Sequence, residues 1–196
     1  MEIDFQLKAL PQFARNLRYK LYCTTPDTTQ WERVAREKLR LRTYHARAIL
    51  EGEELPEPDE QERVAEWCGA SLEDLQSAPI YPADREGMTK ANIVFLLDSL
   101  GHGGKKQVAG RLNVRAEQLS RWRGGQQTPH AGNLRELLRY FSLDPDMDLG
   151  SVPLFLVNFP IHGEARKKWL VKAIQEMPPD KLDRHFESMR KLLTPE

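Results

Sequence analysis

The chain has no long hydrophobic run, few cysteines and no net charge. No stretch of the 196-residue chain approaches the roughly 20 consecutive apolar residues that a helix needs to cross a bilayer. Its first segment, Met1–Leu10, carries Glu2 and Asp4 and lacks the apolar core of a signal peptide. Two cysteines, Cys23 and Cys68, are too few for a disulfide framework or a four-cysteine zinc site. These absences predict a cytoplasmic protein.

Sequence signatures of catalysis are also missing. The chain has no phosphate-binding loop of the Walker type, no nucleophile elbow and no pair of carboxylates at catalytic spacing. Its five histidines are not spaced with cysteines or acids as metal ligands are. We therefore expect neither an enzyme nor a metal or other cofactor.

The net charge of zero is a sum of blocks of opposite sign. Residues 13–50 contain nine Lys or Arg and three Asp or Glu, a local charge of +6. Residues 51–74 contain ten acids and one Arg, a charge of −9. Residues 105–123 contain six basic residues and one acid, a charge of +5. Basic blocks attract phosphate, so a nucleic-acid partner is not excluded, although solvated helix faces would give the same pattern.

Much of the chain repeats after 73 positions. The shift aligns apolar residues with apolar residues, Gly with Gly and Pro with Pro. The aligned pairs are Leu39 and Leu112, Leu41 and Val114, Ile49 and Trp122, Gly52 and Gly125, Pro56 and Pro129, Val64 and Leu137, and Cys68 and Phe141. We expect two copies of one small unit in residues 1–78 and 89–149, a linker at 79–88 and a C-terminal segment at 150–196.

Within each copy the apolar residues recur at helical spacing, and no segment alternates as a strand does. The second copy is expected to hold four helices around residues 93–100, 108–112, 119–122 and 134–141, the first ended by Gly101, Gly103 and Gly104. In the first copy, Thr29 and Glu32 have the spacing of a capping box at the start of the second helix. The expected fold class is all-α.

The most informative stretch is QVAGRLNVRAEQLSRWRGGQQTP, residues 107–129. It holds two short helices joined by a tight turn at Asn113. This stretch resembles the helix-turn-helix of the Cro/C1 (XRE) family of phage repressor DNA-binding domains. LLRYFSLDPDMDL, which follows, resembles that family's closing helix and the start of a fifth. In the first copy, AILEGEELP resembles the turn after the third helix, and RVAEWCGASLEDL resembles the fourth and fifth helices.

The resemblance implies two lambda-repressor-like helix-turn-helix domains, followed here by a C-terminal helical hairpin. In that family the third helix enters the DNA major groove and the second crosses the backbone. In the second copy this implies DNA contacts at Lys105, Lys106, Arg111, Arg115, Ala116, Glu117, Gln118, Ser120 and Arg121. Arg121 is suited to guanine and Glu117 to cytosine, whereas the lysines suit phosphate. Ala116 departs from the longer polar reader that the family often has there.

The same resemblance implies DNA contacts in the first copy at Gln30, Arg33, Arg40, Arg42, Thr43, Tyr44 and Arg47. The acidic stretch after them, centred on residues 51–62, is too negative to lie on DNA. We expect it on the far side of the copy or against another protein. Members of the family can also lose DNA binding and become protein-interaction modules, and this alternative applies to both copies.

The C-terminal segment contains apolar stripes that need a partner. Residues 152–160 are apolar on both faces, and two helices after them cannot bury their stripes alone. They can pack on the chain's own second domain or form a homodimer, which would suit a palindromic operator. The expected dimer contacts are Trp169, Leu170, Ile174, Phe186, Met189 and Leu193.

The resemblance leads to a functional hypothesis. The chain is expected to be a bacterial or phage-encoded, nucleoid-associated transcriptional regulator that binds specific double-stranded DNA. It would act as a repressor, with two reading heads per chain and four per dimer. Two alternatives remain open. One is an antitoxin or immunity-type protein that binds a protein partner and regulates its own gene, and the other is a DNA-architectural accessory factor that bends or bridges sites.

Overall fold

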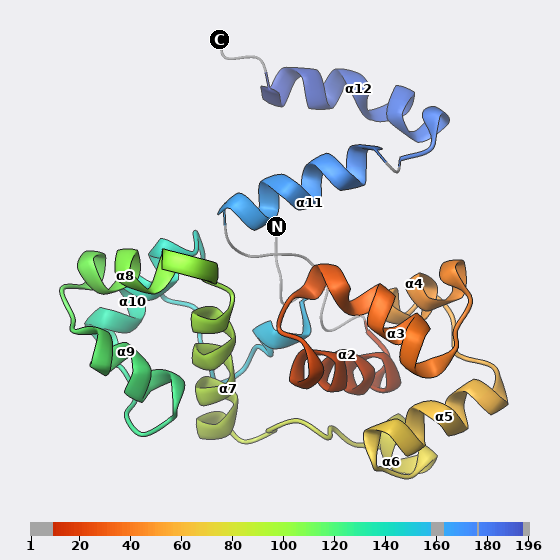
Figure 1. Ribbon diagram of the computed structural model, residues 1–196, viewed down its shortest axis with the longest axis horizontal. Helices are drawn as coiled ribbons and strands as arrows, with labels where there is room; N and C mark the ends of the chain where they lie inside the picture. The colour runs from red at the N-terminus through yellow and green to blue at the C-terminus, as the bar shows by residue number, and fades with distance from the viewer. Residues whose placement is uncertain (1–9, 158–162, 176, 194–196) are drawn as a thin grey trace. The chain divides into compact units, whose positions relative to one another are not determined.

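A computed structural model describes residues 10–157, 163–175 and 177–193, and within these ranges the chain forms helices and turns but no strand (Figure 1). The prediction of an all-α fold is confirmed. The chain divides into two compact units, Met1–Pro160 and Ile161–Glu196. None of the described helices combines the length and the apolar character that a membrane crossing requires.

The first unit contains two successive groups of helices. The first group comprises α2 (Gln12–Thr24), the 3₁₀ helix η1 (Thr28–Gln30), α3 (Trp31–Leu39), α4 (Thr43–Glu51), α5 (Pro58–Cys68) and α6 (Leu72–Ser77). The second group comprises α7 (Arg85–Asp98), α8 (Gly101–Leu112), α9 (Ala116–Arg123) and α10 (Ala131–Tyr140), followed by the 3₁₀ helix η2 (Leu154–Leu156). We call the two groups the first and the second repeat.

Residues that lie 73 positions apart adopt the same left-handed backbone conformation in the two repeats. Three pairs of residues with positive φ are separated by this number. They are Arg40 (55°) and Asn113 (52°), Gly52 (75°) and Gly125 (66°), and Gly69 (71°) and Ser142 (55°). A non-glycine residue in the left-handed region costs roughly 1–2 kcal/mol. The shared left-handed conformations at helix ends therefore mark the same chain path in both repeats.

A buried asparagine closes each repeat in the same way. Asn16 on α2 is fully buried, and its Nδ2 donates to the carbonyls of Leu75 (3.0 Å) and Ala78 (2.8 Å). The equivalent bonds of the second repeat run from Asn92 Nδ2 on α7 to the carbonyls of Leu149 (2.7 Å) and Val152 (2.6 Å). Each asparagine thus fastens the end of its repeat to the first helix. Nothing in the apolar pattern of the sequence indicated this role.

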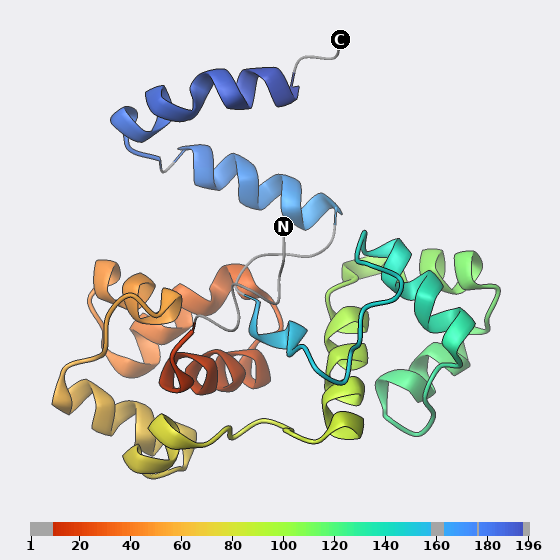
Figure 2. The same cartoon turned by 180° about the vertical axis from the view of Figure 1, so that it is seen from behind.

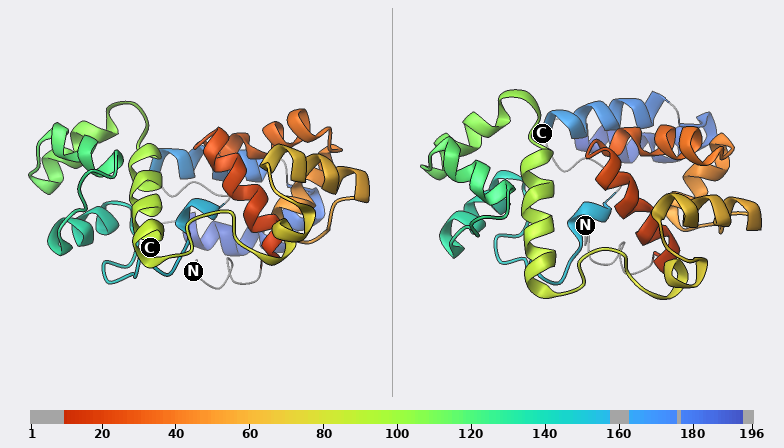
Figure 3. Two further views of the ribbon diagram at one scale, coloured as in Figure 1. Left: turned by 90° about the horizontal axis from the view of Figure 1, so that it is seen from below. Right: turned by 60° about the horizontal axis from the view of Figure 1, so that its bottom comes forward.

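The segment η2 joins the two repeats. It packs against both α2 and α7, and the views in Figures 1, 2 and 3 agree in placing it between these helices. Phe155 is fully buried, and its ring centroid lies 5.5 Å from that of Tyr19 and 5.8 Å from those of Tyr22 and Tyr81. Because Tyr81 belongs to the segment between the repeats, aromatic packing fixes both repeats and their connection in one core.

Arg18 adds a polar clamp at the same place. Its Nε donates to the carbonyl of Leu50 at 2.7 Å, and its Nη1 donates to the carbonyl of Leu156 at 2.9 Å. The side chain is buried, and this burial lowers the pKa of Arg18 to about 10, although Glu51 opposes the shift. The guanidinium therefore links the end of α4 in the first repeat to η2.

This packing corrects the expected C-terminal boundary. Residues 150–157 were predicted to begin the C-terminal segment, but Val152, Leu154, Phe155, Leu156 and Val157 are all buried within the first compact unit. The predicted linker at 79–88 is also shorter, since α7 begins at Arg85. The apolar residues are buried by their own chain, which explains why both faces of the 152–157 stretch are apolar. Residues 158–160 of that stretch lie outside the described residues.

Three local predictions were wrong. Gly101, Gly103 and Gly104 lie in α8 and do not end α7, because a short turn at Ser99 connects the two helices. Thr29 does not cap α3. Instead, the carboxylate of Asp27 accepts hydrogen bonds from the backbone and hydroxyl of Thr29 and caps η1.

The third wrong prediction is the start of a fifth helix in the second repeat. Residues 144–151 form turns where the first repeat has α6. The carboxylates of Asp144 and Asp148 accept hydrogen bonds from the backbone N–H groups of Asp146 and Gly150, each two residues later. Such aspartate turns compete with a helix for the same backbone donors.

The second unit contains α11 (Gly163–Gln175) and α12 (Pro179–Leu193). Large apolar side chains remain exposed on both helices, namely Leu170 (53%), Val171 (50%), Ile174 (38%) and Phe186 (53%). Met189 is half-buried, whereas the side chains of Trp169 and Leu193 lie outside those described. The predicted stripes are therefore accessible at the three expected contact positions Leu170, Ile174 and Phe186.

Candidate nucleic-acid interface

The turn between α8 and α9 fixes the angle at which α9 leaves the second repeat. Asn113 adopts a left-handed conformation, and the backbone N–H of Val114 donates to the carbonyl of Ala109 at 3.0 Å. This is the hydrogen-bonding pattern with which many helices end. On α9, Leu119 and Trp122 are buried, and the helix packs against α7 and α8. The opposite face of α9 is left to solvent.

The exposed face of α9 carries polar side chains that are free to bind a ligand. Arg115, Glu117 and Arg121 are exposed, and their side chains form no hydrogen bond or ion pair within the part of the chain that the structure describes. Gln118 is half-buried and Ala116 is exposed. Ser120 is exposed as well, but its hydroxyl donates to the carbonyl of Ala116 at 3.1 Å. The face therefore offers two guanidinium groups, one carboxylate and one amide.

A basic surface lies on α8, the helix that precedes α9. Lys105, Lys106 and Arg111 are exposed. The guanidinium of Arg111 lies over the ring of Tyr140, 5.8 Å from its centroid, and the hydroxyl of Tyr140 contacts Gln107 at 3.3 Å. Tyr140 thus limits where Arg111 can point. The sequence did not single out Tyr140 or Gln107, because their pairing depends on how α10 packs on α8.

Basic residues of the first repeat are more engaged with their own chain. Arg33 donates to the side chains of Gln30 and Glu37 at 2.9 Å, and Arg47 forms an ion pair with Glu32 at 3.1 Å. Arg40 and Arg42 are exposed, as is Tyr44, whose residue is 68% accessible. Thr43 begins α4, but its side chain lies outside those described.

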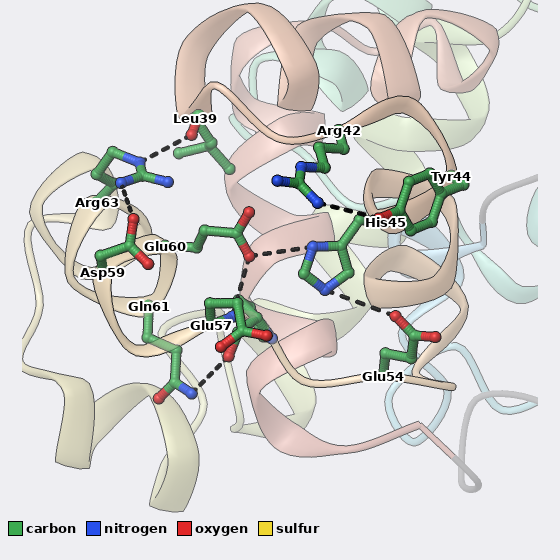
Figure 4. Close-up of polar contacts among 11 residues, drawn as sticks. Leu39, Arg42, Tyr44, His45, Glu54, Glu57, Asp59, Glu60, Gln61 and Arg63 are labelled. Carbon is green, nitrogen blue, oxygen red and sulfur yellow. Dashed lines mark hydrogen bonds and ion pairs between the residues drawn. The ribbon is translucent and has the colours of Figure 1, made fainter.

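Part of the acidic stretch, which was predicted to lie on the far side of the first repeat or against another protein, contacts α4 through His45, whose side chain is 12% exposed. Figure 4 shows carboxylates of this stretch beside α4, where His45 Nδ1 lies 3.1 Å from Glu60 and His45 Nε2 lies 3.6 Å from Glu54. The hydrogen bond that Arg42 donates to the hydroxyl of Tyr44 raises the pKa of Arg42, and the charges of Glu60 and Glu57 act in the same direction. The turn at Gly52 folds the chain back on α4, and this places the acids near the expected DNA-binding helix.

The second repeat has no acid at the corresponding positions. Gln126, Gln127, His130, Gly132 and Asn133 stand where the first repeat has Glu53, Glu54, Glu57, Asp59 and Glu60. The loop after α9 and the start of α10 are therefore free of the negative charge that surrounds α4. The segment that follows the third helix is thus acidic in the first repeat and carries no acid at these positions in the second.

No protein-family model matches the chain, and no curated protein or solved structure matches it either. Among the described residues, no three His, Cys, Asp or Glu side chains gather as metal ligands would. The candidate interface is therefore defined by the structure of this chain alone. It consists of the exposed face of α9, where Arg115, Glu117 and Arg121 have no side-chain partner among the described residues, and of the basic residues on α8.

Proposed function

We propose that the chain is a transcriptional regulator that binds specific double-stranded DNA through helix-turn-helix elements of the Cro/C1 type. The observation that carries this proposal is the exposed α9 face, whose Arg115, Glu117 and Arg121 have no partner within the described chain. A helix of this kind fits the major groove, where arginine reads guanine and glutamate accepts from cytosine. Bound across a promoter, the protein would act as a repressor.

The second repeat is proposed as the main reading head. Its α8 supplies Lys105, Lys106 and Arg111 for the phosphate backbone, and its loop after α9 is free of acids. In the first repeat, Glu54 and Glu60 lie against α4 and oppose the approach of phosphate. Arg40 and Arg42 are exposed there, although Arg42 donates to the hydroxyl of Tyr44, and we assign them a weaker, second contact.

We also propose that the protein acts as a homodimer through α11 and α12. The support for this is the exposure of Leu170, Val171 and Phe186, which are about half accessible in the single chain. Exposed apolar side chains gathered on two short helices are typical of a protein interface. Two chains related by a two-fold axis would bind a palindromic site.

Selection of bound sequences from a random DNA library with the full-length protein tests the function. The expected result is an enriched motif with two symmetric halves, each read by one α9. Enrichment of no motif, together with equal affinity for all duplexes, would refute sequence-specific regulation. It would instead support the architectural alternative if the protein strongly bends these duplexes.

Lys105→Ala is expected to weaken binding to every DNA sequence alike, because an ammonium on α8 contacts phosphate and reads no base. The slope of log Kd against log salt should fall by roughly one. Arg139→Ala is the matched control, since Arg139 is exposed on α10 and already pairs with Glu136. An unchanged slope for Lys105→Ala would remove this residue from the phosphate contacts.

A further inference from the structure

One ion pair joins α9 to the first helix of the second repeat. Arg123 is the last residue of α9, Asp98 is the last residue of α7, and Arg123 Nε lies 2.5 Å from the Asp98 carboxylate. The apolar side chains of Leu119 and Trp122 are buried on the same side of α9. Among the described residues, the pair is the only side-chain hydrogen bond or ion pair that connects α9 to another helix.

The first repeat holds its equivalent helix, α4, by more than one polar contact. Arg47 of α4 forms an ion pair with Glu32 of α3 at 3.1 Å, and His45 of α4 lies 3.1 Å from Glu60 of α5. These contacts have no counterpart on α9, where Ser120 and Gln118 stand in place of Arg47 and His45. The orientation of α9 therefore depends on apolar packing and on a single polar contact at its C-terminal end.

The shared chain path of the repeats does not require this ion pair. The shift of 73 relates Asp98 to Thr25 and Arg123 to Leu50, and neither residue of the first repeat is charged. Helix formation does not favour Asp98 either, because a helix C-terminus carries partial negative charge and the last turn of α7 contains no basic residue. The contact with Arg123 offsets the unfavourable position of this carboxylate.

The ion pair lies where the two repeats meet. Tyr22 of α2 is buried, and its ring centroid lies 5.6 Å from that of Phe95 on α7. Burial raises the pKa of Tyr22, and the charge of Asp98 acts in the same direction, whereas the charge of Arg123 opposes the shift. The side chain of Arg123 is half exposed, but that of Asp98 is only 13% exposed. Water therefore screens their attraction less than it screens a fully exposed pair.

We propose that Asp98 is a positioning residue for DNA recognition, which holds the C-terminal end of α9 through Arg123. It thereby sets the angle at which Glu117 and Arg121 meet the bases, and it contacts no DNA itself. This inference rests on the proposed function, because it concerns the orientation of the helix that is proposed to read the DNA. By charge alone a carboxylate repels phosphate. Removal of Asp98 should therefore strengthen binding if only its charge matters, and weaken specific binding if it positions α9.

Binding titrations of full-length Asp98→Asn with the selected DNA site and with an unrelated duplex, at the same salt concentration, test the proposal. Affinity for the selected site should fall about tenfold, because the end of α9 is no longer held. Affinity for the unrelated duplex should stay the same or rise, since the phosphate contacts remain and one negative charge is gone. Asp98→Glu keeps the carboxylate and should retain most of the specific affinity. An equal change for both duplexes, in either direction, would overturn the proposal.

Two further variants test the pairing. Asp146→Asn is the matched control, since Asp146 is exposed and pairs with Arg135 at 3.1 Å, so the variant loses the same charge and an ion pair that does not involve α9. It should leave the ratio of the two Kd values unchanged. Arg123→Gln combined with Asp98→Asn should weaken specific binding no further than Arg123→Gln alone. Additive losses, or a salt slope that Arg123→Gln lowers by roughly one, would refute Arg123 as the link between Asp98 and α9.

Hydrogen exchange without DNA separates this inference from the proposed function. In full-length Asp98→Asn, the backbone amides of residues 119–123 should exchange about tenfold faster than in the wild type, while those of α4 keep their rates. Unchanged exchange in α9 would overturn the positioning role even if a DNA motif is selected. Equal acceleration in α9 and α4 would indicate a general loss of stability and would overturn it as well. If the library yields no motif, the proposed function fails, and exchange alone decides whether Asp98 holds α9.

Discussion

Deleting residues 161–196 is expected to give a folded monomer that binds its DNA site about 10²–10⁴-fold more weakly than the full chain. The first compact unit ends at Pro160 and keeps η2 in its core. The deleted residues include α11 and α12 with their exposed apolar side chains. Two linked reading heads bind one palindrome with avidity, and a monomer loses this advantage. Light scattering measures the oligomeric state, and a binding titration at fixed salt measures the affinity.

A second truncation provides the control for this experiment. Deleting from Val152 onward removes Phe155 from between α2 and α7, together with the carbonyl of Leu156 that Arg18 binds. Loss of a single buried Phe side chain alone costs about 3–5 kcal/mol, a large part of a domain's stability. This shorter chain is expected to lose cooperative thermal unfolding. A folded protein of this length would contradict the core role of η2, and a dimeric protein ending at residue 160 would contradict the assigned interface.

The sequence predicted those features that depend on local spacing. Helical periodicity identified the buried residues Leu119, Trp122 and Leu137, and the internal shift of 73 predicted the matching turns at Gly52 and Gly125. These features are local because helix faces and turn glycines are set by neighbouring residues. The exposed position of the α9 residues follows from the same periodicity.

Long-range contacts could not be predicted in this way. Phe155 and Leu156 are apolar residues near the start of the C-terminal segment, and their sequence does not tell whether they face their own chain or another. The burial of Arg18 and the pairing of His45 with Glu60 depend on segments that are 138 and 15 residues away in the chain. The contact of the acidic stretch with α4 was therefore not predicted.

The largest effect on sequence recognition is expected from Arg121→Ala. Arg121 is exposed on α9 and has no side-chain partner in the described chain, so its removal should leave the fold intact. If its guanidinium reads guanine, the variant should lose about 1–3 kcal/mol of affinity for the selected site. It should also accept other bases at one position of each half-site. Library selection with the variant measures this relaxation directly.

Comparison of the variants separates residues that contact bases from residues that contact phosphate. Glu117→Ala removes a negative charge and should relax a different position, where the carboxylate would accept from cytosine. Lys105→Ala should leave every position unchanged while lowering the salt slope. Arg139→Ala removes the same charge as Arg121→Ala but lies on α10, and it should alter neither the selected motif nor its strength. If Arg121→Ala and Glu117→Ala select the wild-type motif, α9 does not read the DNA. The exposed side chains of α9 would then belong to a protein interface, the alternative in which such a domain loses DNA binding.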